Sequence, residues 1–360
     1  MKQEEYFGFD AVENLEGVVK GYSEVLLVTG KGSYEGCGAR EEIEGQIENL
    51  TRFCGFGVNP KVEDVERGCK NYGDYGLVIA VGGGSVIDMG KSISTLARQD
   101  GEARDYVTGK RGIDRSKNIP FVAIPTTAGS GSEATHFAVV YVNGVKHSLA
   151  DDSMLPDVSI VDPNFLRSLG GYQRACTSFD ALSQGIESCW SRNSIGESRR
   201  DSLDSVKHIV ESIERYVQGD NSDIVLENMA RGSNLAGQAI NVAKTTGAHA
   251  LSYGFTQFEI FPGQGIPHGH GVALTLPEFF RFNIDGVNNR WIRLLGMVGG
   301  YEGLIGLRRS VGLESISELI EKDVFDEDDL VRIVDNVNVD RSGNNPRDVS
   351  KDDLMKIVGL

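Results

Sequence analysis

The sequence has few of the features that mark secreted, membrane-bound or disulfide-rich proteins. Only five of its 360 residues are cysteines, and no two of them form a CxxC pair. We therefore expect reduced thiols in a cytoplasmic protein, without a disulfide framework or a thiolate zinc site. The opening stretch MKQEEYFGFD has no apolar segment, so no signal peptide is expected, and no apolar run of about 18 residues predicts a membrane span.

Basic residues are also in deficit, because 36 Lys and Arg stand against 52 Asp and Glu, which gives a net charge of −16. This balance argues against binding to nucleic acid, which requires a basic face, and against adhesion to anionic membranes. A small anionic substrate is still compatible with it, because a local basic pocket can exist on an acidic protein. The length of 360 residues favours two domains over a single core.

Short apolar runs alternate with helical patterns in the first part of the chain. Strands are predicted at 24–30, 75–83, 119–127, 136–142 and 158–163, and helices at 38–50 and 85–97. This alternation is typical of an α/β fold with a doubly wound, mostly parallel sheet. We therefore predict an α/β nucleotide-binding domain at residues 1–163.

Long helical patterns dominate from residue 164 onward. They are predicted at 178–191, 197–217, 223–242, 245–255, 272–282, 288–297 and 303–310. Near the end of the chain, a polar loop precedes a short helix with Ser350 as its N-cap and Asp353 at the third helical position. We predict an all-helical domain at residues 164–360.

Two glycine-rich loops each follow a predicted strand. The first, VGGGSVIDMGK at 81–91, runs into a helix whose first turns carry Asp88 and Lys91. Backbone amides at such a helix N-terminus form an anion site that a diphosphate can approach. The second, PTTAGSGSEAT at 125–135, adds hydroxyls suited to a phosphate, a ribose or an amide. The alternatives are a tight turn and a flexible loop without a ligand.

The stretch SFDALSQGIES places Asp180, Gln184 and Glu187 on one inward face of a helix. A buried carboxylate requires compensation, and a metal ion would supply it. His249, on another predicted helix, and His268 and His270, at a loop-to-helix junction, are the imidazole candidates. Such a set suits Zn²⁺ or Fe²⁺. For Gln184, the alternative is a buried amide that bonds to the backbone.

These stretches together resemble the iron-containing, or group III, alcohol dehydrogenases. The matching segments are GGGSxxDxxK (82–91), PTTAGSGSE (125–133), DALxxxIES (180–188), HALSY (249–253) and PHG (267–269), which occur in the order of the family. The resemblance implies a Rossmann-like N-terminal domain, a helical C-terminal domain, and a metal and a nicotinamide that meet in the cleft between them. It also implies homodimers or higher oligomers.

The resemblance also implies which residues form the two sites. The cofactor would be bound by Gly30, Lys31, Gly82, Gly83, Gly84, Ser85, Asp88, Thr126, Thr127, Ser130, Thr135 and Lys146. The metal ligands would be Asp180, Gln184, His249 and His268. The second of these ligands is a histidine in the family, and an amide oxygen is a weaker and harder donor than imidazole.

In the implied reaction, the metal polarises an aldehyde oxygen and the nicotinamide delivers hydride to the carbonyl carbon. The proton would come from water, relayed by His270, by Tyr253 or by the nicotinamide ribose. Tyr253 stands where many members have a histidine close to the nicotinamide. Lys244 and His270 are the cations expected to hold an anionic substrate tail.

The identity of the cofactor depends on the end of the first long strand. Members that prefer NAD have an Asp there, which binds the ribose hydroxyls, whereas this chain has Gly30 followed by Lys31. The lost carboxylate and the nearby cation favour a 2′-phosphate. We therefore predict NADPH over NADH, with the use of both cofactors as the alternative.

A closer resemblance points to the phosphonoacetaldehyde reductase subgroup. It is based on DALSQGIESCWSRNS, NVAKTTGAHALSY and IPHGHGVALTLPEF, although this chain carries extra residues between Tyr253 and His268. The implied function is reduction of a small anionic aldehyde such as phosphonoacetaldehyde. Alternatives are a dehydrogenase of another alcohol or acidic sugar, a non-redox dehydroquinate-synthase-like enzyme, and a non-catalytic protein that has lost the metal.

Overall fold

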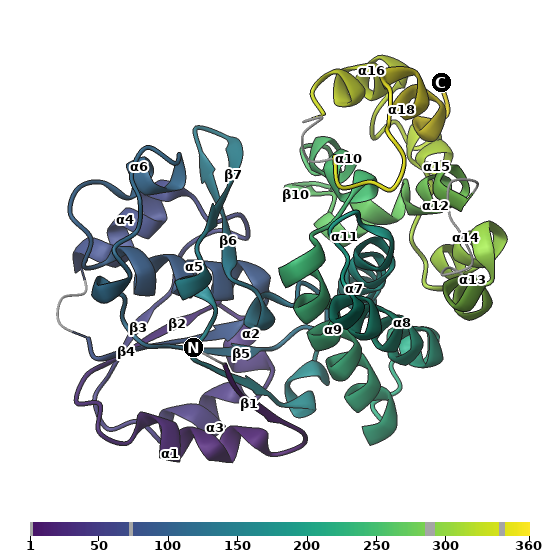
Figure 1. The fold of residues 1–360 in the computed structure, drawn as a ribbon. Coiled ribbons are helices and arrows are strands. Elements are labelled where there is room, and N and C mark those ends of the chain that lie inside the picture. The colour runs from purple at the N-terminus through teal and green to yellow at the C-terminus, as the bar shows by residue number, and fades with distance from the viewer. Residues whose placement is uncertain (1–2, 72–74, 285–291, 338–342) are drawn as a thin grey trace. The chain divides into compact units, whose positions relative to one another are not determined.

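The computed structural model of the chain describes residues 3–71, 75–284, 292–337 and 343–360. The chain divides into two compact units, Met1–Leu169 and Gly170–Leu360 (Figure 1). The sequence placed the change of character a few residues earlier, after residue 163. The first unit combines a sheet with helices, and the second is built almost entirely of helices. The predicted combination of an α/β unit and a helical unit is confirmed.

The first unit contains a six-stranded sheet with the order β1-β8-β5-β4-β2-β3. Every paired neighbour within it runs parallel. Its strands are β1 (Glu4–Phe7), β2 (Val25–Thr29), β3 (Leu50–Phe53), β4 (Leu77–Gly82), β5 (Phe121–Pro125) and β8 (Val158–Val161). β3 lies on one side of β2, whereas β4, β5 and β8 follow on its other side. This reversal of the strand order at β2 is the doubly wound arrangement.

Both faces of this sheet are apolar because alternate residues of each strand point to opposite sides. In β2, Leu26 and Val28 belong to one core and Val25 and Leu27 to the other. The first core is covered by α4 (Val62–Asn71), α5 (Gly84–Leu96) and α6 (Ala103–Val107); the second is covered by α1 (Leu15–Val19) and α3 (Ala39–Glu44). Continuous apolar strands are therefore explained by burial on both faces.

Two predicted elements of the first unit differ from the structure. The strand expected at 136–142 is β6 (Phe137–Val142), which lies outside the main sheet and pairs antiparallel with β7 (Val145–Ala150). The Asn143–Gly144 turn between them has positive φ at both residues, as a tight hairpin requires. The helix expected at 38–50 is also too long, because α3 ends at Glu44, before the edge strand β3.

The long helix α7 (Gly171–Trp190) lies at the centre of the second unit, where it packs against α8 (Gly196–Val217), α9 (Asp223–Ala243) and α11 (His268–Ala273). Every residue of α7 from Ser178 to Trp190 is buried. The other helices in the described part of the unit are α10 (Gly247–Phe255), α12 (Leu276–Ile284), α13 (Ile292–Val298), α14 (Gly300–Ser310), α15 (Ile316–Glu321), α16 (Glu327–Asp335) and α18 (Lys351–Val358).

The second unit also departs from the prediction in detail. A small antiparallel pair, β9 (Glu259–Phe261) and β10 (Gln264–Gly265), lies within the extra residues before His268. The helix expected at 272–282 is split between α11 and α12. Part of the helix expected at 288–297 lies outside the described residues. The helices α15 and α16 were not predicted.

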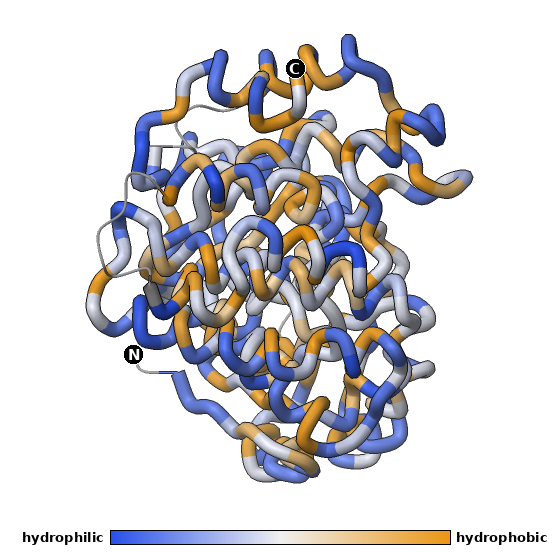
Figure 2. Tube along the Cα trace, turned by 90° about the vertical axis from the view of Figure 1, so that its right-hand side faces the viewer, coloured by the Kyte–Doolittle hydropathy of each residue, from blue (hydrophilic) through white to orange (hydrophobic). Residues whose placement is uncertain are grey.

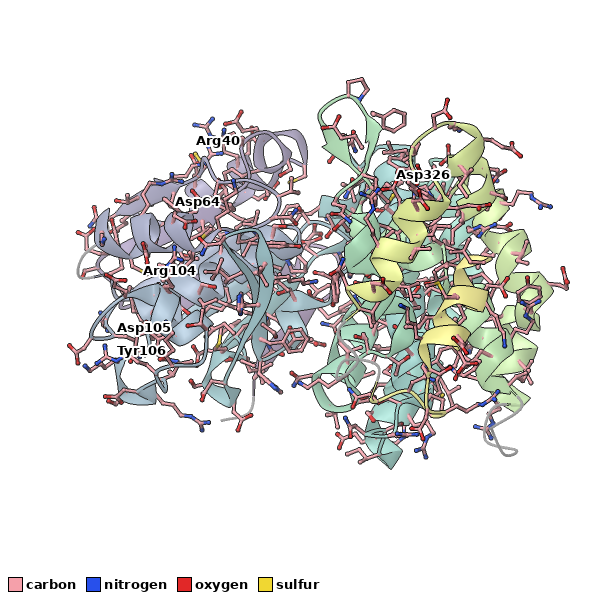
Figure 3. The ribbon with its side chains drawn as sticks, turned by 90° about the horizontal axis from the view of Figure 1, so that it is seen from above. Arg40, Asp64, Arg104, Asp105, Tyr106 and Asp326 are labelled. Carbon is pink, nitrogen blue, oxygen red and sulfur yellow. The ribbon has the colours of Figure 1, made fainter. Side chains whose placement is uncertain are left out.

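Helix ends and surface charges follow ordinary rules in both units. Ser350 and Asp353 form the predicted capping box of α18, and Asp326 starts a similar box in α16 (Figure 3). Arg40 and Arg104 form ion pairs on the outside of the first unit, of a kind that contributes little stability.

Apolar segments are short and alternate with polar ones along the trace (Figure 2). Among the described residues, no helix is long and apolar enough to cross a membrane.

Candidate metal and cofactor sites

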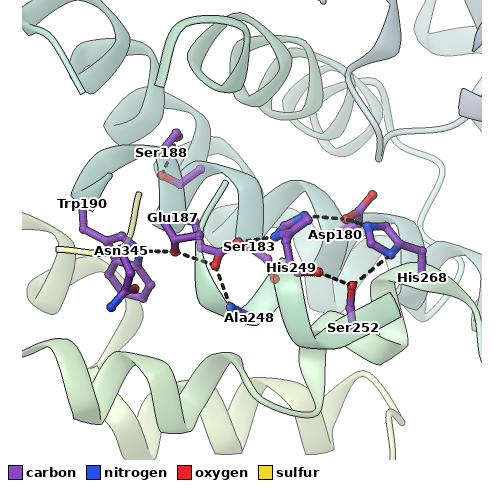
Figure 4. A network of polar contacts seen from close by, with 12 residues as sticks. Asp180, Ser183, Glu187, Ser188, Trp190, Ala248, His249, Ser252, His268 and Asn345 are labelled. Carbon is purple, nitrogen blue, oxygen red and sulfur yellow. Dashed lines mark hydrogen bonds and ion pairs between the residues drawn. The ribbon is translucent and has the colours of Figure 1, made fainter. Parts of the chain in front are cut away.

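Three of the four predicted metal ligands come together in the second unit. Asp180 lies on α7, His249 on α10, and His268 is the first residue of α11 (Figure 4). Asp180 Oδ1 lies 3.3 Å from Nε2 of His249 and 3.8 Å from Nε2 of His268. One ligand atom from each of the three residues lies within 4.8 Å of the others. A single cation could therefore contact all three side chains.

The glycine after His268 explains how α11 reaches α7. A Cβ atom at Gly269 would lie only 1.9 Å from the backbone carbonyl oxygen of Cys176 and 3.0 Å from Cβ of Asp180. No other residue could occupy this position without moving one of the two helices. The PHG sequence thus places an imidazole and a close helix contact next to each other.

Each imidazole is held through its other ring nitrogen. His249 Nδ1 contacts Oε2 of the buried Glu187, two helical turns after Asp180 on α7 (Figure 4). His268 Nδ1 lies 3.2 Å from the Ser252 hydroxyl, which donates to the backbone oxygen of His249 at 2.8 Å. Since each Nδ1–H is directed to an acceptor, the neutral form of each ring keeps its Nε2 lone pair toward Asp180.

The chemistry of this site fits a divalent cation. The buried Gln184 side-chain oxygen has no hydrogen-bond partner in the described part of the chain, one helical turn after Asp180. Burial acts to lower the pKa of His249, but the Glu187 and Asp180 carboxylates outweigh it and raise that pKa to about 10. The site therefore favours positive charge. One carboxylate and two imidazoles are donors that Zn²⁺ and Fe²⁺ accept. Gln184 as a fourth ligand stays a prediction.

The structure does not support a catalytic role for His270. This side chain is fully buried, with Nδ1 2.9 Å from the Tyr172 hydroxyl and Nε2 3.0 Å from the backbone oxygen of Glu314. The carbonyl can only accept, so Nε2 carries the hydrogen and Nδ1 accepts from Tyr172. Burial also lowers the pKa of His270. Both ring nitrogens are thus used inside the protein, and the ring holds α11 in place.

Tyr253 and Lys244 have different surroundings. The Tyr253 ring is stacked on the His268 ring, with centroids 5.5 Å apart and planes 5° from parallel. Tyr253 therefore lies against the metal-ligand cluster. Lys244 ends α9 with φ 61° and ψ 174°, an uncommon backbone for a residue with a side chain, and its ammonium donates to the Asn241 carbonyl at 3.1 Å.

In the first unit, the two predicted cofactor loops touch each other. A Cβ atom at Gly84 would lie 2.6 Å from the Ser130 hydroxyl, and one at Gly83 would lie 3.3 Å from Thr127. Gly82 ends β4, and Thr126 donates its amide to the Gly82 carbonyl at 3.0 Å. The glycines are therefore needed for contact between the loops as well as for an open helix N-terminus. Ser85 is turned aside, because its hydroxyl contacts the Val58 carbonyl.

Asp88 and Lys91 connect α5 with the second loop. The Asp88 carboxylate accepts from the Ser132 hydroxyl at 2.6 Å and from the Val139 amide at 2.9 Å. The fully buried Lys91 ammonium donates to the Thr135 hydroxyl at 2.9 Å and to the Phe137 carbonyl at 3.0 Å. Both carboxylate oxygens of Asp88 are thus occupied within the protein. Any effect of Asp88 on a cofactor would act through the loop that it holds.

This buried pair has shifted pKa values. Burial raises the pKa of Asp88, although Lys91 opposes the change. Burial lowers the pKa of Lys91 to about 8, against the influence of Asp88 and Glu133. Lys146, on β7, is a further cation that acts on Asp88. The positive charge of Lys146 thus acts on the same carboxylate as that of Lys91.

The end of β2 carries a cation that the sequence did not reveal. Gly30 follows β2, and Lys31 after it is exposed. Arg52, on the neighbouring strand β3, donates to the Thr29 hydroxyl at 2.7 Å and to the Gly30 carbonyl at 3.2 Å. Its guanidinium also lies over the Tyr34 ring. The pairing of β2 with β3 is the signal that could have located Arg52 here, because two helices separate the two strands in sequence.

Two residues of the metal site were also missed as functional. Glu187 was placed on the correct helix face, but no role was assigned to it. Ser252 stands within HALSY, three residues after His249, where one helical turn brings its hydroxyl close. Spacing was thus a usable signal for Ser252, whereas the contact of Glu187 with His249 depends on how α7 and α10 pack.

Comparison with known proteins gives the same family for both units of the chain. A profile described as "Iron-containing alcohol dehydrogenase" matches residues 3–163, and one described as "Fe-containing alcohol dehydrogenase family, C-terminal" matches residues 174–359. Long-chain-alcohol dehydrogenase 1 of Geobacillus thermodenitrificans is 34% identical over 63% of this chain and 57% of its own length. Phosphonoacetaldehyde reductase of Streptomyces viridochromogenes is 30% identical over 79% of this chain and 75% of its own length.

A solved structure extends the similarity to the whole chain. Sulfoacetaldehyde reductase from Bifidobacterium kashiwanohense, in complex with NAD⁺, superposes with a TM-score of 0.88 at 26% identity and covers 99% of this chain and 96% of that one. Both units thus have counterparts in one group of proteins. The chain belongs to the iron-containing alcohol dehydrogenase family, a family of metal- and NAD(P)-dependent oxidoreductases that act on alcohols.

Proposed function

We propose that the protein reduces a small anionic aldehyde, of the phosphonoacetaldehyde type, to the corresponding alcohol with NADPH. The observation that carries the proposal is the cluster of the buried Asp180 and His249 with the half-buried His268. Beside it lies the Gln184 oxygen, which has no hydrogen-bond partner among the described residues. A buried carboxylate flanked by two oriented imidazoles is a donor set that would hold a divalent cation, and such a cation would supply a Lewis acid.

The residues of the second unit would perform distinct tasks. Asp180, His249 and His268 would hold the cation, with Gln184 as a further, weaker oxygen ligand. A divalent cation bound here supplies a Lewis acid for a carbonyl oxygen. Tyr253, stacked on His268, would form one wall of the substrate position. Its hydroxyl is the side-chain group that we propose as the proton donor. His270 is not part of this proposal, because its two ring nitrogens bond within the protein.

The residues of the first unit support a dinucleotide as the hydride source. The open N-terminus of α5 presents backbone amides after Gly83, and α5 is long enough to have a marked dipole. Thr126, Thr127 and Ser130 would supply further polar contacts. We propose NADPH because no carboxylate stands at Gly30, while Lys31 places a cation at the end of β2. Arg52 adds a second cation there, which is paired with Glu35 at 3.2 Å.

The anionic substrate class is supported by the relatives. Phosphonoacetaldehyde and sulfoacetaldehyde, named in two of them, are both aldehydes with an anionic group. In this chain, Lys244 lies in the short segment that leads from α9 into α10, the helix of His249. We propose that Lys244 holds the anionic tail, and that the uncommon backbone at this residue directs its side chain.

The experiment that tests the function is the oxidation of NADPH, followed at 340 nm, by protein reconstituted with Fe²⁺ or Zn²⁺. Phosphonoacetaldehyde, sulfoacetaldehyde, propanal and butanal would be compared at equal concentration. We expect the anionic aldehydes to be preferred in kcat/KM, and the preference to fall in Lys244→Gln. Turnover of the neutral aldehydes alone would refute the anionic substrate. Metal-replete protein without net NADPH consumption would refute the redox function.

A further inference from the structure

We propose that Glu187 is a positioning residue of the metal site, whose carboxylate orients His249 and thereby sets the affinity for a divalent cation. The inference rests on the proposed metal site, and it concerns a residue that would not itself touch the metal. Glu187 is fully buried on α7, on the same face as Asp180 and Gln184. A buried carboxylate at this position requires a reason, since it costs free energy unless its partners compensate for it.

Both oxygens of Glu187 bond to the first turn of α10 (Figure 4). Oε1 accepts from the Thr246 hydroxyl at 2.7 Å and from the Ala248 amide at 2.9 Å, while Oε2 contacts His249 Nδ1. Thr246 precedes α10 and Ala248 is its second residue. The positive end of a helix favours an anion at this place. One carboxylate therefore caps α10 and holds the ligand that this helix carries.

The contact decides which ring nitrogen of His249 can bind a metal. A carboxylate only accepts, so Nδ1 carries a hydrogen and Nε2 keeps its lone pair in the neutral ring. Nε2 is the atom that lies 3.3 Å from Asp180 Oδ1. A carboxylate partner also increases the basicity of an imidazole ligand. Without Glu187, His249 could rotate or carry its hydrogen on the nitrogen that faces Asp180.

A hydrogen bond from Trp190 to Thr246 helps to hold Glu187 in place. The Trp190 indole donates to the Thr246 hydroxyl at 2.8 Å, and that hydroxyl donates its only hydrogen to Glu187. Rotation of this hydroxyl would break both bonds, because it accepts from Trp190 and donates its only hydrogen to Glu187. Trp190 lies almost one turn after Glu187 on α7. The order Trp190, Thr246, Glu187, His249 is thus a continuous buried chain of donors and acceptors that ends at the site.

His268 provides an internal comparison. Its Nδ1 is held by the Ser252 hydroxyl at 3.2 Å, a neutral partner at a longer distance. A carboxylate bond to an imidazole is stronger than a bond to a hydroxyl. We therefore expect the site to depend more on Glu187 than on Ser252.

The test is the titration of metal-free protein with Co²⁺, followed by the visible absorption of bound cobalt and by competition with a chelator. Glu187→Gln keeps the shape of the side chain and removes the charge, and we expect affinity for Co²⁺ to fall about 10- to 100-fold. Ser252→Ala should cause a smaller loss. Ser188→Ala is the matched control: Ser188 is buried on α7 and bonds to Ser202 instead of α10. Its Co²⁺ affinity should equal that of the wild type.

Thr246 gives a test that does not require the loss of Glu187. Thr246→Val removes the hydroxyl and should weaken Co²⁺ binding by about 10-fold, and Thr246→Ser restores the hydroxyl and should restore the affinity. This pair decides the matter if Glu187→Gln does not fold. Wild-type affinity in Glu187→Gln, or an equal loss in Thr246→Val and Thr246→Ser, would overturn the inference.

Thermal unfolding separates positioning from a structural role. A merely structural Glu187 would lower the Tm of metal-free and metal-loaded protein equally. A positioning residue reduces the increment in Tm that Co²⁺ produces, because that increment depends on Kd. An unchanged increment in Glu187→Gln would contradict the proposal. If the wild-type protein itself binds no Co²⁺, the proposed metal function fails, which is a different result from a variant that binds as well as the wild type.

Discussion

The carboxylate of Asp180 faces Nε2 of His249 at 3.3 Å and Nε2 of His268 at 3.8 Å. The planes of the two imidazole rings are inclined at 67°, closer to perpendicular than to parallel, and the ring centroids are 5.4 Å apart. Two nitrogens and one oxygen that converge in this way, with their other ring nitrogens held, form a preorganised site.

Removal of either end of this cluster should therefore remove the metal. We expect Asp180→Ala and His268→Ala to lose bound Fe²⁺ or Zn²⁺ and to lose more than about 100-fold in turnover, since they delete a ligand and not merely its support. Metal content per chain, measured by plasma emission, and the NADPH assay check this. Ser188→Ala is the control: Ser188 is buried on the same helix as Asp180 but bonds to Ser202, so the metal should be retained. An active, metal-replete His268→Ala protein would refute the ligand assignment.

Gln184 can be tested in two directions. Gln184→His introduces an imidazole in place of an amide oxygen, and we expect the affinity for Zn²⁺ to rise by about 10-fold or more. Gln184→Leu removes the buried oxygen that has no hydrogen-bond partner in the described residues, so the free energy of unfolding should not fall. The affinity of this variant for Zn²⁺ should fall, because an oxygen ligand has been lost. Competition titration and urea unfolding measure the two effects. Equal Zn²⁺ affinity in both variants would show that position 184 does not contact the metal.

The choice of cofactor should depend on the end of β2. In Gly30→Asp, the new carboxylate should repel a 2′-phosphate and bind ribose hydroxyls, and we expect the ratio of kcat/KM for NADPH to that for NADH to fall at least about 10-fold. The added Cβ would meet the Ser33 hydroxyl at 2.4 Å, but Ser33 is exposed and can rotate. Gly30→Ala controls for this steric effect. The same ratio in the Asp and Ala variants would disprove the role of charge.

The buried Lys91 should make stability depend on pH. Its pKa is about 8 in the folded protein, whereas the usual value in an unfolded chain is 10.5. Between these values the unfolded chain binds more protons than the folded one, so this group makes the free energy of unfolding rise from about pH 8 to about pH 10.5. The contribution is fully unfavourable below pH 8.

Lys91→Met provides the comparison for that pH dependence. At pH 7 it should lower the free energy of unfolding by about 3–5 kcal/mol, because Asp88 loses its nearest cation. The difference between wild type and variant should then grow from pH 8 to pH 10.5. Urea unfolding at pH 7, 8, 9 and 10 measures it. Parallel profiles for the two proteins would mean that Lys91 does not titrate in this range.

The local pattern of apolar residues was sufficient to predict helices and strands whose buried residues recur at regular spacing. The strand at Leu77–Gly82 and the helix at Gly84–Leu96 were predicted within one or two residues, because an uninterrupted apolar run ends in glycines there. The hairpin that holds Phe137–Val142 was assigned to the main sheet instead, although Asn143–Gly144 is a strong turn signal. Alternation of apolar residues identifies a strand but not its partner.

In the candidate site too, positions along one helix could be predicted, whereas contacts between elements that are distant in sequence could not. Asp180, Gln184 and Glu187 could be placed on one face from their spacing alone. That His270 points into the protein, toward Tyr172 and Glu314, could not be inferred, since both partners are distant in sequence and one is a backbone oxygen. Arg52 reaches the end of β2 only through strand pairing. Contacts between elements depend on packing geometry, which residue spacing does not contain.

Gly269 allows α11 to lie against α7, and this brings together residues that are far apart in the chain. Asp180 and His268 are separated by about 90 residues, and a cation shared by them would act as a removable cross-link across α8, α9 and α10. Closing a loop of that length restricts the unfolded chain by an amount that is worth about 4 kcal/mol for a covalent link. Chelation would therefore make the second unit more open to proteases, with the first cuts between the two ligands.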